Sequence, residues 1–314
     1  MNISLREITY ILTIAEEGNI TKAAARLFIA QPSLSQAVKK IENDLGTPLF
    51  SRVKGGLTLT EAGRYFVEAG RRIDGIAAEL QSNIMDLSSL QGGSLRLGTP
   101  YHLGAYILPG LLTEFRKYYP LVNVTLQEAS SDKLETLICD GSIDAALMPL
   151  PIKQNCIKYH PFFKSRMVLV MAKDSPYNRF AYCGDPKDKL QWFDLTNAAD
   201  APFLIGVKGQ RIRTVTEIVF QRAGILPNIV MRSQNVETIR RIAAVGYGLA
   251  IMPEHYIINT DQSIPANYYY LPPHQDYEWT IVLAYYEHGI LPRTVSSLIE
   301  IMDQSPLRNA GLIS

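Results

Sequence analysis

Residues 19–46 read NITKAAARLFIAQPSLSQAVKKIENDLG and predict two short helices separated by a tight break. Thr21 is the expected N-cap of the first helix, because its hydroxyl can accept a hydrogen bond from a free backbone N–H group. Pro32 falls in the first turn of the second helix, where its missing N–H has no partner within the helix. Gly46 is expected to end that helix in the left-handed conformation that glycine adopts easily. The stretch therefore indicates a helix-turn-helix.

The second helix is predicted to bury one face and to expose the opposite one. Its apolar residues recur at helical spacing and are Leu34, Val38, Ile41 and Leu45. The opposite face is polar and carries Gln31, Ser33, Ser35, Gln36, Lys39, Lys40 and Asn43. Amides can pair with base edges, hydroxyls allow close approach, and lysines reach phosphates, so this face suits the major groove of DNA. A merely solvated face is the alternative that the helix alone leaves open.

A hairpin is predicted directly after this helix. Residues 49–52 and 57–60 alternate in polarity around Gly55 and Gly56, which can supply the positive φ angles of a tight turn. Cations near the tip would contact the DNA backbone beside the groove, as in a winged helix-turn-helix. The residues predicted to contact DNA are Thr21, Gln31, Pro32, Ser33, Ser35, Gln36, Lys39, Arg52 and Lys54.

These motifs resemble the DNA-binding end of LysR-type transcriptional regulators. The resemblance covers residues 1–90 and is carried, in the family's order and spacing, by TKAAARL (21–27), QPSLS (31–35), LGTPLFSR (45–52) and LTLTEAG (57–63). It implies a double-stranded operator or promoter with imperfect two-fold symmetry, a small-molecule effector, and dimers that pair into a tetramer. Contact with RNA polymerase is a further partner that the resemblance implies.

Length and charge agree with more than one domain. The chain has 314 residues, which predicts two or three units, and its net charge is only +1. Residues 1–59 carry seven cationic and five anionic side chains, a weak excess. The position of the cations, on the second helix and the wing, is therefore more informative than their number.

Residues 60–90 predict a long helix with an apolar seam. Side chains that are apolar except for Asn83 repeat every seven residues in two interleaved sets: Phe66, Ile73, Leu80 and Leu87, then Ala62, Ala69, Ile76, Asn83 and Leu90. Such a pattern over about four heptads favours a coiled-coil dimer. Packing on the helix's own globular domain is the alternative. A dimer would present two recognition helices to two half-sites.

From residue 91 the pattern changes to alternating strands and helices, which predicts an α/β fold with parallel strands. Residues 91–94, QGGS, are the expected linker. The runs DGSIDAA (140–146) and GYGLAIMP (246–253) resemble the effector domain of the LysR family, which is similar to type 2 periplasmic binding proteins. The predicted organisation is a winged helix-turn-helix (1–59), a dimerisation helix (60–90) and a two-lobed effector domain (91–314). Lobe I is expected at about 92–165 and 268–303, and lobe II at about 166–267.

The effector is expected between the lobes, beyond the carboxyl ends of the strands, where helix N-termini offer free N–H groups. Thr99 and Ser130 stand where the resembling family places effector contacts. The residues predicted to bind effector are Thr99, Pro100, Tyr101, Ser130, Met148, Ile205 and Asn235. Hydroxyls and N–H groups of this kind suit a small carboxylate or another small anion.

The three cysteines, Cys139, Cys156 and Cys183, form no CxxC motif and predict neither a zinc site nor a disulfide framework. Cys139 lies in a helical apolar pattern and is interpreted as packing, with a redox-sensing pair as the less favoured alternative. No cofactor or metal is expected. No export signal or membrane-spanning segment is recognised, so the expected location is the cytoplasm.

An enzyme would require a nucleophile with its base, or metal ligands. The chain contains no GxSxG and no HExxH motif. The prediction is a sequence-specific DNA-binding transcriptional regulator, not an enzyme, whose activity is modulated by a small molecule. A small-molecule binding protein or an enzyme built on the same α/β lobes is the alternative.

Overall fold

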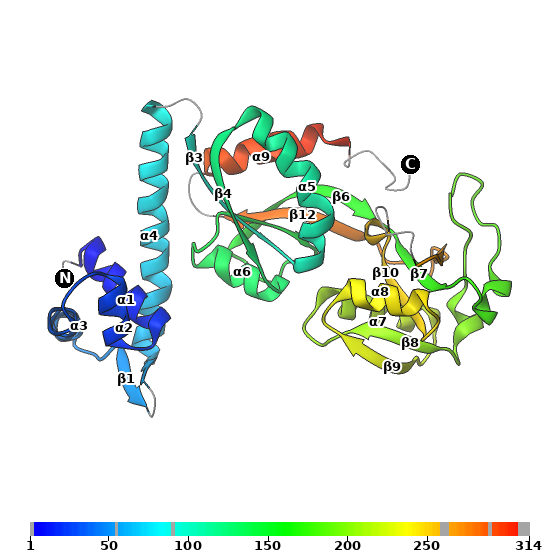
Figure 1. Ribbon diagram of the computed structural model, residues 1–314, viewed down its shortest axis with the longest axis horizontal. Helices are drawn as coiled ribbons and strands as arrows, with labels where there is room; N and C mark the ends of the chain where they lie inside the picture. Colours follow the sequence, from blue (N-terminus) through cyan, green and yellow to red (C-terminus); the bar gives the residue numbers. More distant parts are fainter. Residues whose placement is uncertain (1–2, 54–55, 89–91, 258–263, 288–290, 307–314) are drawn as a thin grey trace.

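The computed structural model describes residues 3–53, 56–88, 92–257, 264–287 and 291–306. An N-terminal helical module, one long helix and two α/β lobes follow each other along the chain (Figure 1). The predicted fold class is confirmed in this order of parts. Within the described residues, no helix is both long and apolar enough to cross a membrane.

The N-terminal module packs three helices around an apolar core and adds a two-stranded wing. Its elements are α1 (Leu5–Glu17), α2 (Ile20–Arg26), α3 (Gln31–Leu45), β1 (Phe50–Val53) and β2 (Gly56–Leu59). Ser4 and Glu7 form a reciprocal capping box at the start of α1, and Gly18 ends α1 with a φ of 59°. The prediction that Thr21 caps α2 is wrong. Asn19 is the cap, because its Oδ1 accepts hydrogen bonds from the backbone N–H groups of Thr21 (2.8 Å) and Lys22 (3.2 Å).

The wing is fixed to the rest of the module at its base. The Glu42 carboxylate of α3 accepts hydrogen bonds from the backbone N–H groups of Leu49 (2.7 Å) and Phe50 (3.2 Å). Gly63 lies so close to the wing that a Cβ atom there would be 2.0 Å from the Leu49 carbonyl oxygen. Lys54, predicted to contact DNA, lies outside the described residues.

The long helix α4 (Glu61–Ser88) begins at Thr60, whose hydroxyl accepts a hydrogen bond from the Gly63 N–H at 3.0 Å. Its first half packs on α1, where Val67 is buried and a Cβ at Gly70 would touch Ile8. Farther along, the predicted seam is exposed: Ile73 is 44% exposed, Ile76 64% and Leu80 60%. The side chains of Asn83 and Leu87, and the whole of Leu90, lie outside the part of the chain that the structure describes.

Lobe I is a five-stranded sheet in the order β4-β3-β5-β12-β6. Its elements are β3 (Gly92–Thr99), α5 (Tyr101–Tyr118), β4 (Leu121–Glu128), α6 (Ser131–Cys139), β5 (Ala145–Pro149), β6 (Ile157–Ser165), β12 (Trp279–Tyr286) and α9 (Arg293–Gln304). Strands β3, β4 and β5 are parallel, as predicted, whereas β12 runs antiparallel to β5 and β6.

Lobe II repeats this plan with the order β11-β7-β10-β8-β9. Its elements are β7 (Met167–Ala172), the 3-10 turns η1 (Pro176–Phe180) and η2 (Leu195–Ala198), β8 (Pro202–Gly206), α7 (Arg211–Ala223), β9 (Asn228–Ser233), α8 (Val236–Ala244), β10 (Leu249–Pro253), η3 (Glu254–Tyr256) and β11 (Ala266–Tyr270). The chain crosses between lobes after β6 and again between β11 and β12 (Figure 1).

Two boundaries and one strand differ from the sequence expectations. Residues 92–94, expected in a linker, begin β3 because they pair with β4. Residues 268–270, assigned to lobe I, belong to lobe II because β11 pairs with β7. The strand β6 was not predicted, since Pro161 argues against a central strand; it lies at the sheet edge, where proline is tolerated.

The interpretation of Cys139 as simple packing is also wrong. Cys139, at the end of α6, forms a disulfide with Cys156, and their Cα atoms are 6.2 Å apart. Cys183 is free and exposed. A spacing of 17 residues without a CxxC motif gives no sequence signal for such a pair.

Candidate DNA-binding and effector-binding sites

The polar face of α3 is presented to solvent as one continuous surface. Leu34, Val38 and Ile41 are buried against the module's core and fix the rotation of the helix about its axis. The side chains that this rotation turns outward include Gln31, Pro32, Ser33, Gln36 and Lys39, with Ser35 half-buried beside them. Thr21 of α2 and Arg52 of β1 are exposed on the same module. The structure thus leaves the described members of the predicted DNA-contacting set available for a partner.

Cations of the module differ in whether an acidic side chain already pairs with them. Lys40 Nζ lies 3.1 Å from the Glu7 carboxylate, and Arg26 pairs with Glu16 (2.8 Å) and Glu17. Among the described residues, Lys39 and Arg52 have no ion-pair partner. These two cations are therefore free to approach a phosphate without first breaking an intramolecular pair.

A cavity of about 310 Å³ lies between the two lobes. The N-terminal ends of α5 and α6 form one wall, and the segment that leads into α7 forms the other. The residues that line it include Pro100, Tyr101, His102, Ser130, Ser131, Lys208, Gln210, Arg211, Tyr256 and Trp279. Such a volume is in the range of small-molecule sites.

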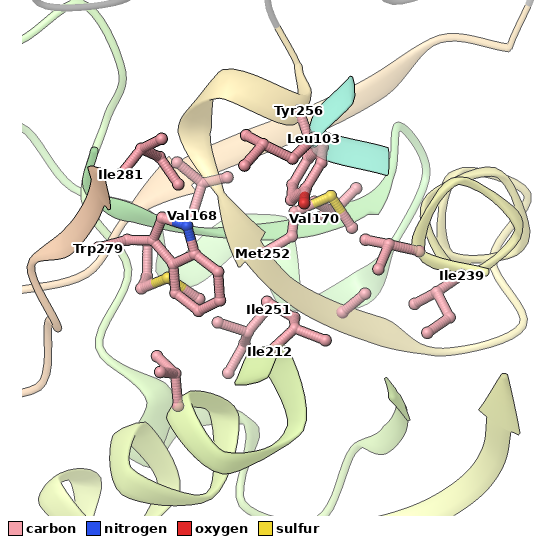
Figure 2. Close-up of a cluster of buried hydrophobic side chains, with 14 of the residues drawn as sticks. Leu103, Val168, Val170, Ile212, Ile239, Ile251, Met252, Tyr256, Trp279 and Ile281 are labelled. Atoms are coloured by element: carbon pink, nitrogen blue, oxygen red, sulfur yellow. The ribbon is translucent and has the colours of Figure 1, made fainter. Parts of the chain in front are cut away.

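The floor of this region is a continuous apolar core shared by both lobes. Figure 2 shows side chains of lobe I, such as Leu103 and Trp279, in one buried cluster with side chains of lobe II, such as Tyr256 and Ile212. Because side chains from both lobes interdigitate here, movement of one lobe against the other must repack this core.

A buried ion pair joins the lobes at one side of the cavity. Arg211 of α7 donates a hydrogen bond to the Glu135 carboxylate of α6, and their side chains are 6% and 2% exposed. The other Glu135 oxygen accepts hydrogen bonds from the backbone N–H groups of Lys153 and Gln154, both at 2.9 Å. Both carboxylate oxygens of Glu135 therefore have hydrogen-bond donors, one from Arg211 of lobe II and the other from the segment after β5.

Two further hydrogen bonds join the lobes on the side of α5 and α8. The Val236 N–H donates to His102 Nε2 at 3.2 Å, and the Tyr106 hydroxyl donates to Glu237 at 2.9 Å. Burial lowers the pKa of His102 and favours the neutral ring that can accept this bond. Burial opposes ionisation of Glu237, but hydrogen bonds from Arg240, Arg241 and Tyr106 outweigh it and lower the pKa of Glu237 to about 2.

Two buried donors beside the cavity lack a partner in the described part of the chain. They are Arg211 Nε and Trp279 Nε1. A buried N–H without an acceptor is unfavourable, so each is a place where a ligand oxygen would be stabilised.

The predicted effector residues fall into two groups. Pro100, Tyr101 and Ser130 line the cavity. Thr99, Met148 and Ile205 are buried in the lobes, and Asn235 instead caps α8 by accepting a hydrogen bond from the Thr238 N–H. The structure does not bring this second group to the cavity wall.

Comparison with known proteins identifies the family. Residues 5–64 match the family described as "Bacterial regulatory helix-turn-helix protein, lysR family", and residues 88–306 match the "LysR substrate binding domain". The chain belongs to the LysR family.

Similar proteins match nearly the whole length of the chain. The HTH-type transcriptional regulator YcgK of Bacillus subtilis is 27% identical over 311 residues, which span 96% of this chain and 95% of YcgK. A full-length OxyR variant of Pseudomonas aeruginosa has the same fold, with a TM-score of 0.74, 23% identity and coverage of 98% and 97% of the two chains. CbnR in complex with its target DNA has a TM-score of 0.68, 21% identity and coverage of 96% and 99%. This LysR protein is a DNA-binding transcriptional regulator with an effector-binding domain.

Sequence reasoning missed the buried polar residues of the LysR effector domain. Glu135 and Arg211 are the main examples, joined by Tyr256 and Trp279. One signal was available: Glu135 lies on the same face of its helix as Leu134 and Ile138, and a carboxylate on an apolar face requires a partner.

A wider hollow of about 770 Å³ lies on lobe II of this LysR chain, around Arg166 and Trp192. Several of its charged groups are already paired, since Arg166 contacts Asp188 (2.9 Å) and Asp276 (3.4 Å), and Lys164 contacts Glu278 (2.8 Å). The cavity between the lobes instead has the buried donors of Arg211 and Trp279 beside it, which have no partner among the described residues, and it is therefore the better candidate for effector binding.

Proposed function

We propose that α3 enters the major groove, with Gln31, Ser33 and Gln36 facing base edges and with Lys39 and Arg52 on the backbone. The observation that carries this assignment is the exposure of the whole polar face above a buried apolar stripe. Amide side chains pair with bases, whereas cations on phosphates add affinity without sequence information. The regulator acts on a two-fold symmetric operator in the cytoplasm, where the DNA is also available to RNA polymerase.

The test separates base contacts from phosphate contacts. A duplex that binds the full chain is first selected from a random pool. Ser33→Ala or Gln36→Ala should then lower affinity for the selected duplex by about 1–3 kcal/mol per lost base contact and change binding to random duplexes little. Arg52→Ala should weaken both equally, and so should Lys54→Ala. Gln221→Ala, an exposed glutamine on lobe II, is the matched control. If every variant of the N-terminal module lost the same affinity for the selected duplex as for random duplexes, the assignment of α3 as the recognition helix would be contradicted.

The exposed seam of α4 supports dimerisation of this regulator. Ile73, Ile76 and Leu80 form an apolar stripe that a second copy would bury. Ile76→Asp should shift the chain toward monomer in sedimentation, whereas Asp74→Ser, on the opposite face of α4, should not. If both variants sediment as the wild type does, another surface mediates assembly. The effector domains would pair these dimers into tetramers.

The effector is a small carboxylate or another small anion, bound between the lobes. Arg211 is neutralised by Glu135, so the favourable potential comes from Lys208, the helix N-termini and the unpaired donors of Arg211 and Trp279. Ligand binding would change the closure of the lobes, and so the spacing of the DNA-binding modules, only through different affinity for two arrangements.

Fluorescence can test the anion. The chain has two tryptophans, and Trp279 lines the cavity whereas Trp192 does not. In a Trp192→Phe variant, titration with small carboxylates should change the emission, while their neutral amides should not. If only the uncharged compounds bind, the effector is not an anion.

A further inference from the structure

The disulfide lies at the junction between the effector domain and the helix of the DNA-binding module. Arg72 Nε of α4 donates a hydrogen bond to the carbonyl oxygen of Cys139 itself, at 2.9 Å. The neighbouring Arg71 pairs with Asp140 at 3.0 Å. A Cβ atom at Gly75 would be only 3.3 Å from the Gly141 carbonyl oxygen, so the two backbones are in close contact. The end of α6 is thus one part of lobe I that α4 contacts directly.

Helix α6 begins at the cavity between the lobes. Ser130 and Ser131 line the cavity at the N-terminus of α6, and Glu135 pairs with Arg211 one turn later. Glu135 also holds the backbone of residues 153–154, and Cys156 of the same segment is bonded to Cys139. The segment after β5 is therefore attached to α6 at two points, one near the cavity and one near α4.

The two bridged cysteines lie at the edge of an apolar cluster of lobe I. Cys139 and Cys156 are both half-buried there, so neither residue is fully enclosed in the core. A DNA-binding regulator acts beside DNA, where thiol systems keep most cysteines reduced and where disulfides usually open and close. The Cys139–Cys156 disulfide is therefore expected to open and close, and not only to serve as a permanent cross-link.

We propose that Cys139 and Cys156 form a reversible thiol–disulfide site that transmits the redox state of low-molecular-weight thiols to α4. In the oxidising direction, one cysteine thiolate attacks a small disulfide and releases one small thiol. The second cysteine thiolate then attacks the protein sulfur of the mixed disulfide, closes the bridge and releases the second small thiol. Two electrons and two protons pass from the protein dithiol to the small disulfide, and reduction reverses both steps.

The first experiment asks whether the site titrates. Full-length protein is equilibrated with mixtures of reduced and oxidised glutathione, and free thiols are then alkylated with a maleimide and counted by mass. Because the chain has three cysteines and Cys183 is free, labelling should fall from three to one as the mixture becomes more oxidising. Cys183→Ser should shift both counts down by one. A bridge that stays closed in excess reduced glutathione, or never closes in excess oxidised glutathione, overturns the proposal.

The second experiment asks whether the site acts on α4. Hydrogen exchange of residues 71–75 should be at least about 5-fold faster in the reduced protein than in the oxidised protein, a factor typical of coupled sites. The affinity for the selected duplex should change by a similar factor. Both differences should vanish in Cys139→Ser/Cys156→Ser and persist in Cys183→Ser. Identical exchange and identical DNA affinity in the two redox states of the wild type would overturn the coupling, without reliance on any variant.

Discussion

The α3 face and the interlobe cavity are both proposed as binding surfaces, but they are built in opposite ways. The α3 face comes from a single helix, and its polar side chains are exposed. The cavity is assembled from both lobes, and the buried ion pair beside it joins Glu135 and Arg211, which are 76 residues apart. The α3 face therefore needs no rearrangement to meet DNA, whereas the cavity already contains interactions that couple the two lobes.

This difference predicts that single substitutions will have large effects in the cavity and small effects in the DNA-binding module. Buried charges lose much when one partner is removed, because the remaining charge stays out of water. Exposed or local interactions contribute less, because solvent replaces them. Three measurements arranged by expected size test this contrast.

The largest effect is expected at the buried pair. Arg211→Met should lower the free energy of unfolding by about 3–5 kcal/mol, because the Glu135 carboxylate remains buried without its cation. The double variant Glu135→Gln/Arg211→Met should lose less than Arg211→Met alone. Urea unfolding followed by tryptophan fluorescence measures both.

An exposed pair provides the control for this comparison. Lys117 Nζ lies 2.6 Å from Glu114 Oε2, and the two side chains are 64% and 43% exposed. Lys117→Met should cost at most about 1 kcal/mol. If Arg211→Met costs no more than Lys117→Met, the pair in the cavity is not buried in solution.

An intermediate effect is expected from pH at His255, which is fully buried behind the cavity with Nδ1 3.2 Å from Ser165 Oγ. Burial lowers the pKa of His255 to about 3. Below the ordinary histidine pKa of about 6.5, the unfolded chain binds a proton at His255 that the folded chain does not bind. The free energy of unfolding therefore falls as pH falls below about 6.5, and His255 contributes little pH dependence well above that value. Between pH 6.5 and pH 5 the free energy of unfolding should fall by about 2 kcal/mol.

His255→Gln should reduce this slope, and the remainder should include His102, whose pKa burial also lowers. Urea unfolding at a series of pH values gives the slope. His274→Gln, at an exposed position, should retain the full slope. A wild-type stability that does not change between pH 6.5 and 5 would show that solvent reaches the buried ring.

The smallest effect is expected at a local cap. Asn19→Ala should cost about 1 kcal/mol, because the Thr21 and Lys22 N–H groups lose their acceptor. Faster hydrogen exchange at these two amides measures the loss. Asn43→Ala, exposed on α3, should leave the same amides unchanged. A loss as large as that of Arg211→Met would contradict the contrast between the two regions.

The same contrast explains what could be predicted from the sequence. The spacing of Leu34, Val38 and Ile41 determines which face of α3 is exposed, so the exposure of most residues predicted to contact DNA follows from local periodicity. The order of strands and helices likewise predicts both lobes. Cap and boundary errors, such as Thr21 for Asn19, arise where neighbouring residues have similar chemistry.

The cavity could be predicted only in part, because strand ends locate it but do not say which side chains face it. Thr99 ends β3 as expected, yet the chain turns at Pro100 and places the Thr99 side chain against Gly104 of α5. The pairs Tyr106–Glu237 and Cys139–Cys156 depend on tertiary contacts between elements that have no shared periodicity. These contacts require the folded chain.

The close approach of Gly63 to Leu49 and of Gly70 to Ile8 makes the first half of α4 one rigid body with the DNA-binding module. Helix α4 contacts lobe I at residues 71–75, which lie roughly 15–21 Å from the start of the helix at about 1.5 Å per residue. A tilt of about 10° at this contact moves the start of the helix by roughly 3 Å, close to the spacing of successive base pairs, which is about 3.4 Å. In the proposed dimer, a small rotation at the effector domain would therefore change which base pairs the second recognition helix reaches.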